Sequence, residues 1–233
     1  QSTLVISTPT GTGWLDPAGH DTMEFILGGD VATIAMQYSY LASWLSLLTE
    51  PKYSGESARA LFRKVYAYWR ALPVDKRPKL YLHGLSLGTY GSEQSAKLYE
   101  IFDQPFDGVL WVGPPFPSQT WSGATADRKP GSPQWLPRFG DGSLVRFTNQ
   151  TTSPSEQGDQ WGKIRIIYLQ YASDPIVFFS PSMLFNKPDW MSAPKGPDVS
   201  PQFRWYPVIS FMQLVVDMMI ATTSPIGYGH VYA

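Results

Sequence analysis

Residues 80–91, with the sequence LYLHGLSLGTYG, constrain the fold more than any other part of the chain. Residues 80–82 are typical of an apolar strand, and about residues 89–102 of a helix. Between them, Gly84, Ser86 and Gly88 fit the pattern G-x-S-x-G, a sharp strand-to-helix turn with a serine at its apex. Glycine on both sides removes side chains that would collide with the strand and the helix. This turn would hold the Ser86 hydroxyl at a helix N-terminus, where developing negative charge is favoured. The alternative is a turn whose serine only caps the helix.

Four further apolar runs predict buried strands of the parallel type, at residues 3–6, 31–36, 108–113 and 164–169. Helical periodicity predicts helices at residues 16–27, 57–72 and 209–221. This alternation predicts an α/β fold, a three-layer sandwich with a mostly parallel sheet and helices on both faces. Residues 114–142 and 181–207 are proline-rich and irregular, so we expect lid-like segments there. No linker interrupts the chain, and we expect one domain over residues 1–233.

Composition removes several classes of function. The chain has 233 residues and a formal net charge of −1, which argues against nucleic acid as a partner. It has no cysteine, so disulfides, thiolate zinc sites and cysteine nucleophiles are excluded. No group of His, Asp and Glu has the spacing of metal ligands, so we expect no metal and no cofactor. No run of 18 or more apolar residues occurs.

A serine hydroxyl needs a base to take its proton as it attacks, and the base needs an acid to orient it. Downstream of Ser86, Asp174 follows a predicted central strand, and His230 lies in a glycine-flanked loop near the C-terminus. The order Ser, Asp, His is that of serine nucleophiles on elbow turns. We therefore predict Ser86 as nucleophile, Asp174 as acid and His230 as base.

Other residues compete for these roles. His83 lies inside the strand before the turn and is expected to be buried and hydrogen-bonded locally, and His20 is expected to be exposed. Asp103 and Asp107 precede a strand, which places them at the wrong end of the sheet, while Asp198 is a weaker candidate for the acid. Asp174 itself precedes proline and has the alternative role of opening a turn.

The glycine-rich residues 7–14 follow the first strand, where an oxyanion-binding N–H is expected; we assign that role to Thr12 and to Leu87. A phosphate loop is the alternative, but its lysine is missing, and an ordinary turn is another. Aromatic residues near the ends of strands are expected to line a substrate pocket: Trp14, Tyr38, Tyr40, Trp111 and Phe178.

Several separated motifs occur in one order: GTGW at 11–14, AMQYSY at 35–40, GLSLG at 84–88, WVGPP at 111–115, ASDPIV at 172–177 and GH at 229–230. With them the chain resembles the α/β-hydrolase superfamily over nearly its whole length. It is most similar to bacterial membrane-anchored α/β-hydrolases with a multi-span N-terminal region. The resemblance implies a serine hydrolase with the same Ser86, Asp174 and His230. It departs from the usual plan because the first two antiparallel strands, a clear strand before His230 and the final helix are missing.

Together these patterns predict a serine hydrolase that cleaves carboxylic esters with apolar or lipid-like acyl groups. An acyltransferase with the same triad and a non-enzymatic binding module are the alternatives, and peptidase and thioesterase activities stay open. The resemblance further implies a membrane-associated protein, attached through a region before residue 1. We expect its catalytic domain to be extracytoplasmic or periplasmic, and this fragment to be soluble. The sequence does not define an oligomeric state.

Overall fold

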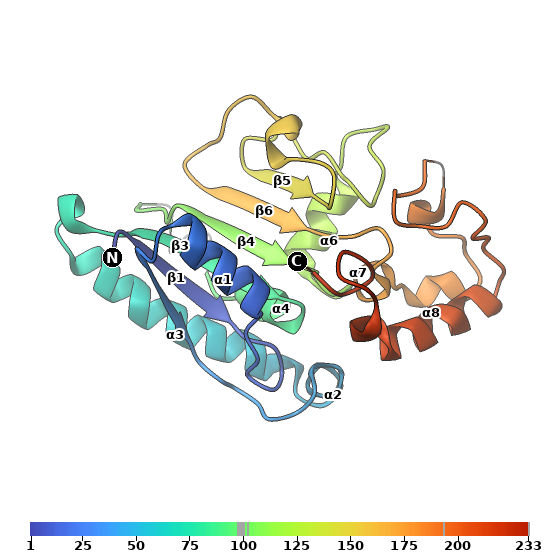
Figure 1. The fold of residues 1–233 in the computed structure, drawn as a ribbon, viewed down its shortest axis with the longest axis horizontal. Coiled ribbons are helices and arrows are strands. Elements are labelled where there is room, and N and C mark those ends of the chain that lie inside the picture. The colour runs from blue at the N-terminus through green and yellow to red at the C-terminus, as the bar shows by residue number, and fades with distance from the viewer. Residues whose placement is uncertain (97–100, 102, 193, 233) are drawn as a thin grey trace. The chain divides into compact units, whose positions relative to one another are not determined.

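The computed structural model describes residues 1–96, 101, 103–192 and 194–232 (Figure 1). Its strands are β1 (Thr3–Thr8), β2 (Val31–Ala35), β3 (Lys79–Leu85), β4 (Gly108–Val112), β5 (Val145–Thr148) and β6 (Arg165–Leu169). Its α-helices are α1 (Pro17–Ile26), α2 (Ser43–Thr49), α3 (Pro51–Ala71), α4 (Leu87–Glu93), α6 (Gln119–Ala126), α7 (Pro175–Phe178) and α8 (Ile209–Met219). Short 3₁₀ helices span Val74–Lys76, Pro154–Gln157, Pro181–Leu184, Asp189–Met191 and Ala221–Thr223.

The strand order is β2-β1-β3-β4-β6-β5, and β1 pairs in parallel with both β2 and β3, as does β3 with β4. The register sets Ser7 of β1 opposite His83 of β3, and Thr8 opposite Gly84. The predicted α/β class with a parallel sheet is therefore confirmed. The chain divides into two compact units, residues 1–112 with 161–167 and residues 113–160 with 168–233. The expectation of one domain stays a prediction.

In the first unit, α1 lies in front of the strands and α3 behind them (Figure 1). The Asp16 carboxylate caps α1 by accepting from the N–H groups of Ala18 and Gly19. Helix α3 begins at Pro51, six residues before the predicted start, because proline suits the first position of a helix. Its buried stripe includes Phe62, whose ring stacks on Tyr66 at 5.0 Å. The apolar periodicity of this helix thus builds the core, as predicted.

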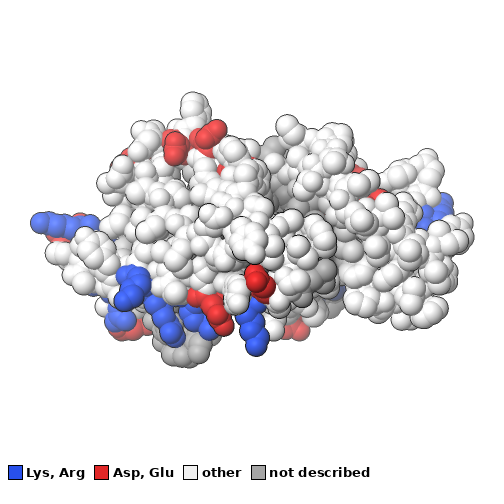
Figure 2. Space-filling view, turned by 90° about the horizontal axis from the view of Figure 1, so that it is seen from below, with Lys and Arg blue, Asp and Glu red and all other residues white. Residues whose placement is uncertain are grey.

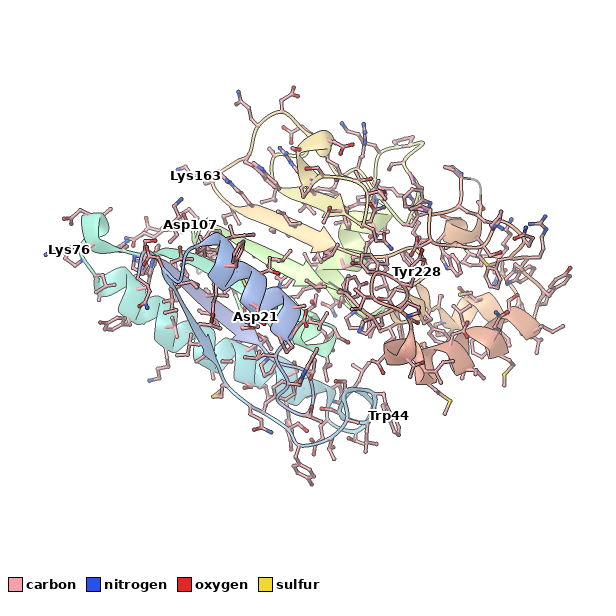
Figure 3. All side chains as sticks on the ribbon, in the orientation of Figure 1. Asp21, Trp44, Lys76, Asp107, Lys163 and Tyr228 are labelled. Atoms are coloured by element: carbon pink, nitrogen blue, oxygen red, sulfur yellow. The ribbon has the colours of Figure 1, made fainter. Side chains whose placement is uncertain are left out.

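The prediction that residues 31–36 form a buried strand is wrong as to burial. Strand β2 stands at the edge of the sheet, and residues 33–36 are exposed. The burial of a strand depends on the elements that pack on its faces, and an apolar sequence alone does not show these. Helix α2 follows this strand, and its Trp44 is also exposed (Figure 3).

In the second unit, the segment predicted to be irregular at 114–142 contains helix α6, which buries Trp121. Trp121 is the one large apolar side chain of this helix, so the sequence shows little helical periodicity there. In the other predicted irregular segment, 181–207, the described residues form two short 3₁₀ helices. A buried arginine organises the chain around β5, since Arg146 donates to the carbonyl oxygens of Gly142, Pro154 and Gln160. These bonds satisfy loop carbonyls that regular structure does not reach.

The helix at residues 209–219 lies within the predicted range 209–221 and is mostly apolar. Only Ser210 and Leu214 of α8 are buried, and the outward side chains include Ile209, Met212, Val216 and Met219. No helix among the described residues has the length and hydropathy needed to cross a membrane. On the face drawn in Figure 2, Lys/Arg and Asp/Glu side chains are interspersed, and most of the surface is uncharged.

Candidate active site

Ser86 occupies the apex of a sharp turn between β3 and α4. Its backbone has φ 57° and ψ −123°, a conformation that a residue with a side chain adopts only when its surroundings enforce it. The N–H of Ser86 donates to the carbonyl oxygen of Val112 at 2.9 Å, and the Thr89 hydroxyl donates to the carbonyls of Gly84 (2.7 Å) and Val112 (2.9 Å). These bonds fasten the turn to strand β4.

Both glycines of the motif have a steric reason. A Cβ at Gly84 would lie 2.6 Å from the backbone carbonyl carbon of Gly88, and a Cβ at Gly88 would lie 2.1 Å from the carbonyl oxygen of Thr8. The predicted elbow geometry is therefore confirmed. Helix α4 begins at Leu87, so it starts two residues earlier than predicted, and it ends at Glu93. Residues 97–100 and 102 of the predicted helix lie outside the described residues.

The glycine-rich loop after β1 is held by the segment that follows β2. The Gln37 amide donates to the carbonyl oxygens of Thr12 and Ser39, each at 3.0 Å, and the Tyr38 hydroxyl donates to the carbonyl of Pro9 at 3.2 Å. Burial raises the pKa of Tyr38 to about 12, so the phenol stays a donor. The structure thus brings the loop with Thr12 and Trp14 next to the segment with Tyr38 and Tyr40.

Asp174 and His230 form a buried pair within the second unit. The Nδ1 atom of His230 lies 2.7 Å from Oδ2 of Asp174. A carboxylate only accepts hydrogen bonds, so Nδ1 carries a proton, and in a neutral imidazole Nε2 is then the unprotonated nitrogen. Nε2 is buried and has no hydrogen-bond partner among the described residues. The imidazole is therefore oriented on one side and open to accept a proton on the other.

Asp174 also caps α7, so it has the local structural role that the alternative interpretation of Asp-Pro gave it. Its Oδ1 atom accepts from the N–H groups of Ile176 (2.8 Å) and Val177 (3.4 Å). The cap points the carboxylate in a fixed direction, and the other oxygen faces His230. The local structural role and the pairing with histidine are compatible because they use different oxygens.

A tyrosine that the sequence analysis did not select completes this cluster. The Tyr232 hydroxyl donates to Oδ2 of Asp174 at 2.6 Å, and its ring is edge-on to His230 at 5.7 Å. Gly113, at φ 52°, makes room for both rings, since a Cβ there would lie 2.7 Å from Tyr232 and 2.9 Å from His230. The only signal in the sequence was an aromatic residue two positions after the histidine.

Asp198 has a supporting role. Its Oδ2 atom accepts from the backbone N–H (2.9 Å) and hydroxyl (2.5 Å) of Ser173, and the Ser173 hydroxyl accepts from the N–H of Gly229 at 2.9 Å. Ser173 and Gly229 adjoin Asp174 and His230 along the chain. Asp198 therefore fixes the two loops rather than the imidazole.

Two hollows of the second unit border these loops. The larger has a volume of about 340 Å³ and is lined by Ser173, Asp217, Ala221, Tyr228 and Gly229 among others. The smaller, of about 190 Å³, is lined by residues that include Asp174, Trp190 and Asp198. Burial raises the pKa of Asp217, which lines both.

A second serine–histidine pair lies in the first unit. The Ser7 hydroxyl is 3.0 Å from Nδ1 of His83 and 3.2 Å from Nε2 of His20. Ser7 is fully buried, and burial lowers the pKa of His83 to about 4. His83 is a buried, locally bonded residue, as predicted, whereas the expected exposure of His20 is wrong because α1 packs it against Ser7 and His83.

The remaining candidates differ in accessibility. Trp111 and Phe178, predicted to line the pocket, are 5% and 3% exposed, whereas Tyr40 is 85% exposed.

The rival carboxylates have structural partners elsewhere. Asp107 accepts from the N–H of Leu80 at the start of β3, and Asp103 pairs with Arg70 at 3.4 Å. Asp107 lies at the end of the strands away from their arrowheads, as predicted (Figure 3). No three His, Cys, Asp or Glu side chains gather as metal ligands in the described part of the chain.

A parallel sheet with a strained serine at the end of a central strand defines an α/β-hydrolase type of protein. A sequence model of an alpha/beta-hydrolase family matches residues 1–233, so the chain belongs to that family. No curated protein matches the sequence. Among solved structures, a cutinase-like protein from Cryptococcus sp. is similar, with 16% identity over 76% of this chain and 78% of its own, at a TM-score of 0.40. An acetyl xylan esterase gives 12% identity over 76% and 84%, at a TM-score of 0.38.

Proposed function

We propose that this protein is a serine hydrolase of carboxylic esters, with Ser86 as nucleophile, His230 as base and Asp174 as acid. One observation carries the proposal: His230 is bonded to Asp174 through Nδ1, while its buried Nε2 has no hydrogen-bond partner among the described residues. A neutral imidazole in that state is suited to take the proton of a serine. The corresponding nucleophile is the hydroxyl of Ser86, whose strained backbone lies at the start of α4.

In the proposed reaction, Oγ of Ser86 attacks the acyl carbon while its proton passes to Nε2 of His230. The oxyanion of the tetrahedral intermediate receives the N–H groups of Leu87 and Thr12, each lowering the barrier by about 3 kcal/mol. The intermediate collapses, and the leaving alkoxide takes the proton from Nε2. Water then attacks the acyl-enzyme and gives a proton to Nε2. The second tetrahedral intermediate collapses, the carboxylic acid leaves, and Oγ of Ser86 takes the proton back from Nε2.

We propose that the acyl group is apolar or lipid-like. The exposed Trp14 and Tyr40 and the half-buried Tyr38 belong to the two loops that the Gln37 and Tyr38 side chains join. Aromatic side chains offer large apolar area near the loop that carries Thr12. Attachment to a membrane, and a site outside the cytoplasm, stay predictions of the family resemblance.

The test is hydrolysis of p-nitrophenyl acetate, octanoate and dodecanoate by the wild type and by Ser86→Ala. We expect kcat/KM to rise from acetate to octanoate, and the variant to lose about 10⁴-fold or more on each ester. Ser122→Ala removes an exposed hydroxyl from α6 and is the matched control, with unchanged rates.

Retention of activity by Ser86→Ala would overturn the proposed nucleophile. Preference for acetate, or for charged esters, would overturn the apolar acyl group. Adding a short alcohol and analysing the products separates hydrolysis from acyl transfer, since only a transferase yields the new ester as its main product.

A further inference from the structure

The Asp174 carboxylate is surrounded by four described donors, two on each oxygen. Oδ1 accepts the N–H groups of Ile176 and Val177. Oδ2 accepts both Nδ1–H of His230 at 2.7 Å and the hydroxyl of Tyr232 at 2.6 Å. The imidazole and the phenol therefore share one oxygen atom, and the charge of that oxygen is divided between them.

We propose that Tyr232 is a positioning residue of the catalytic centre, which fixes the Asp174 carboxylate and weakens its hold on protonated His230. Its consequence is that His230 stays unprotonated, and so able to accept the Ser86 proton, at a lower pH than a histidine–aspartate pair alone would allow. This inference rests on the proposed function, since it assigns Tyr232 a part in the same reaction.

The surroundings of Tyr232 hold its hydroxyl in place. Its ring stacks on Tyr171 with centroids 4.3 Å apart, and the hydroxyl oxygen lies 3.4 Å from the N–H of Tyr171 as an acceptor. Burial, reinforced by the Asp174 charge, raises the pKa of Tyr232 well above its usual value. The phenol is consequently protonated, and so a donor, at neutral pH.

The direction of the effect follows from charge. A hydrogen bond to a carboxylate stabilises its negative charge and draws it toward the donor. Less negative charge then faces the imidazolium that forms when His230 is protonated, so the protonated form is stabilised less. Without the phenol, Oδ2 turns its whole charge to His230, and the imidazole binds its proton more tightly.

The other titratable groups around the pair are Tyr171, which stacks on Tyr232, Asp198, which binds Ser173, and Asp217 on α8, which lines both hollows. All three remain in a Tyr232→Phe variant. They act equally in wild type and variant, so a difference between the two reports the Tyr232 hydroxyl.

The test is the second-order rate of labelling by a fluorophosphonate probe, measured from pH 5 to pH 9 for wild type and Tyr232→Phe. This probe needs an activated serine but no known substrate. We expect the acidic limb of the profile to move upward by about 0.5–1 pH unit in the variant, with the plateau at high pH retained within about twofold. Tyr206→Phe removes an exposed hydroxyl of the same unit and should leave the limb in place.

A second substitution covers a variant that fails to fold. Replacement of Tyr232 by 3-fluorotyrosine keeps the ring and makes the phenol a stronger donor, so the limb should move downward. An unmoved limb in the folded Phe variant or in the fluorotyrosine protein would overturn the inference, even if the plateau fell, because a purely structural role lowers rates without moving the limb. A wild type that is not labelled at any pH would instead overturn the proposed function.

Discussion

Gly88 leaves room for the backbone of β1, because a Cβ at this position would lie 2.1 Å from the carbonyl oxygen of Thr8. Backbone cannot move aside as a flexible side chain can, so Gly88→Ala should displace the turn that carries Ser86. We expect the free energy of unfolding to fall by about 2–3 kcal/mol and the ester activity to be lost.

The chain offers a matched control for this change. A Cβ at Gly123, within helix α6, meets nothing within 4 Å. Gly123→Ala should leave activity unchanged and raise the free energy of unfolding by about 0.5–1 kcal/mol, because alanine favours helix. Urea denaturation of both variants measures the two free energies of unfolding. Equal changes in the two variants would show that Gly88 is not required for lack of space.

His83 gives the stability of the fold a defined pH dependence. Burial, with a smaller contribution from His20, lowers its folded pKa from 6.5 to about 4. Below pH 6.5 the unfolded chain binds a proton that the folded chain excludes, so stability falls as pH falls from 6.5 to 4. The loss reaches about 3 kcal/mol near pH 4. The lowered pKa of His20, also due mainly to burial, acts in the same direction.

Urea denaturation at pH 7.5 and pH 4.5 measures this dependence. His83→Gln removes the titrating group while keeping a polar side chain, so its stability should fall less between the two pH values, whatever its stability at pH 7.5. A variant with the full wild-type loss would contradict the assignment of the effect to His83.

At the scale of elements, α3 is held by its buried aromatic stripe. Phe62 is 0% exposed, stacks on Tyr66 and meets Phe106 edge-on at 5.9 Å. Phe62→Ala should lower the free energy of unfolding by about 3–5 kcal/mol because it leaves a cavity. Tyr68→Ala, on the exposed face of the same helix, should change it by less than about 0.5 kcal/mol. Thermal or urea unfolding of the pair checks both values.

Elements with their own periodicity were predictable from sequence, such as α3 and the strand before Ser86. Their signals are local: a stripe at helical spacing, an apolar run, a glycine on each side of a serine. The start of α3 was placed six residues too late, since residues 51–56 carry few apolar side chains. Helix α6 was missed because one large apolar side chain gives little helical periodicity. Strand β2 was taken as buried because the covering of a surface depends on contacts far along the chain.

The same limit applies to the candidate site. Ser86, Asp174 and His230 were selected by residue type and order, and the bond between His230 and Asp174 agrees with that selection. Tyr232, Ser173 and Asp198 act through hydrogen bonds that a one-dimensional pattern does not contain. Gly113 was visible as part of a motif, but its reason, the two rings that pack on it, appears only in three dimensions.

At the scale of the molecule, the proposed chemistry draws on both compact units. Ser86 belongs to the first, whereas Asp174, His230 and Tyr232 belong to the second. Each unit fixes its own groups. The first holds Ser86 in its strained turn, and the second orients His230 through the Asp174 carboxylate, which accepts hydrogen bonds on both oxygens. The central claim is that these two prepared groups act as one serine–histidine system.

Covalent labelling by a fluorophosphonate probe, read by intact mass and mapped to a peptide, tests this claim most directly. The wild type should gain one probe adduct, on Ser86, and Ser86→Ala none. His230→Gln should be labelled at least about 10³-fold more slowly, since the serine then lacks its base. Labelling of Ser86→Ala at the wild-type rate, an adduct on another serine such as Ser7, or undiminished labelling of His230→Gln would contradict the account.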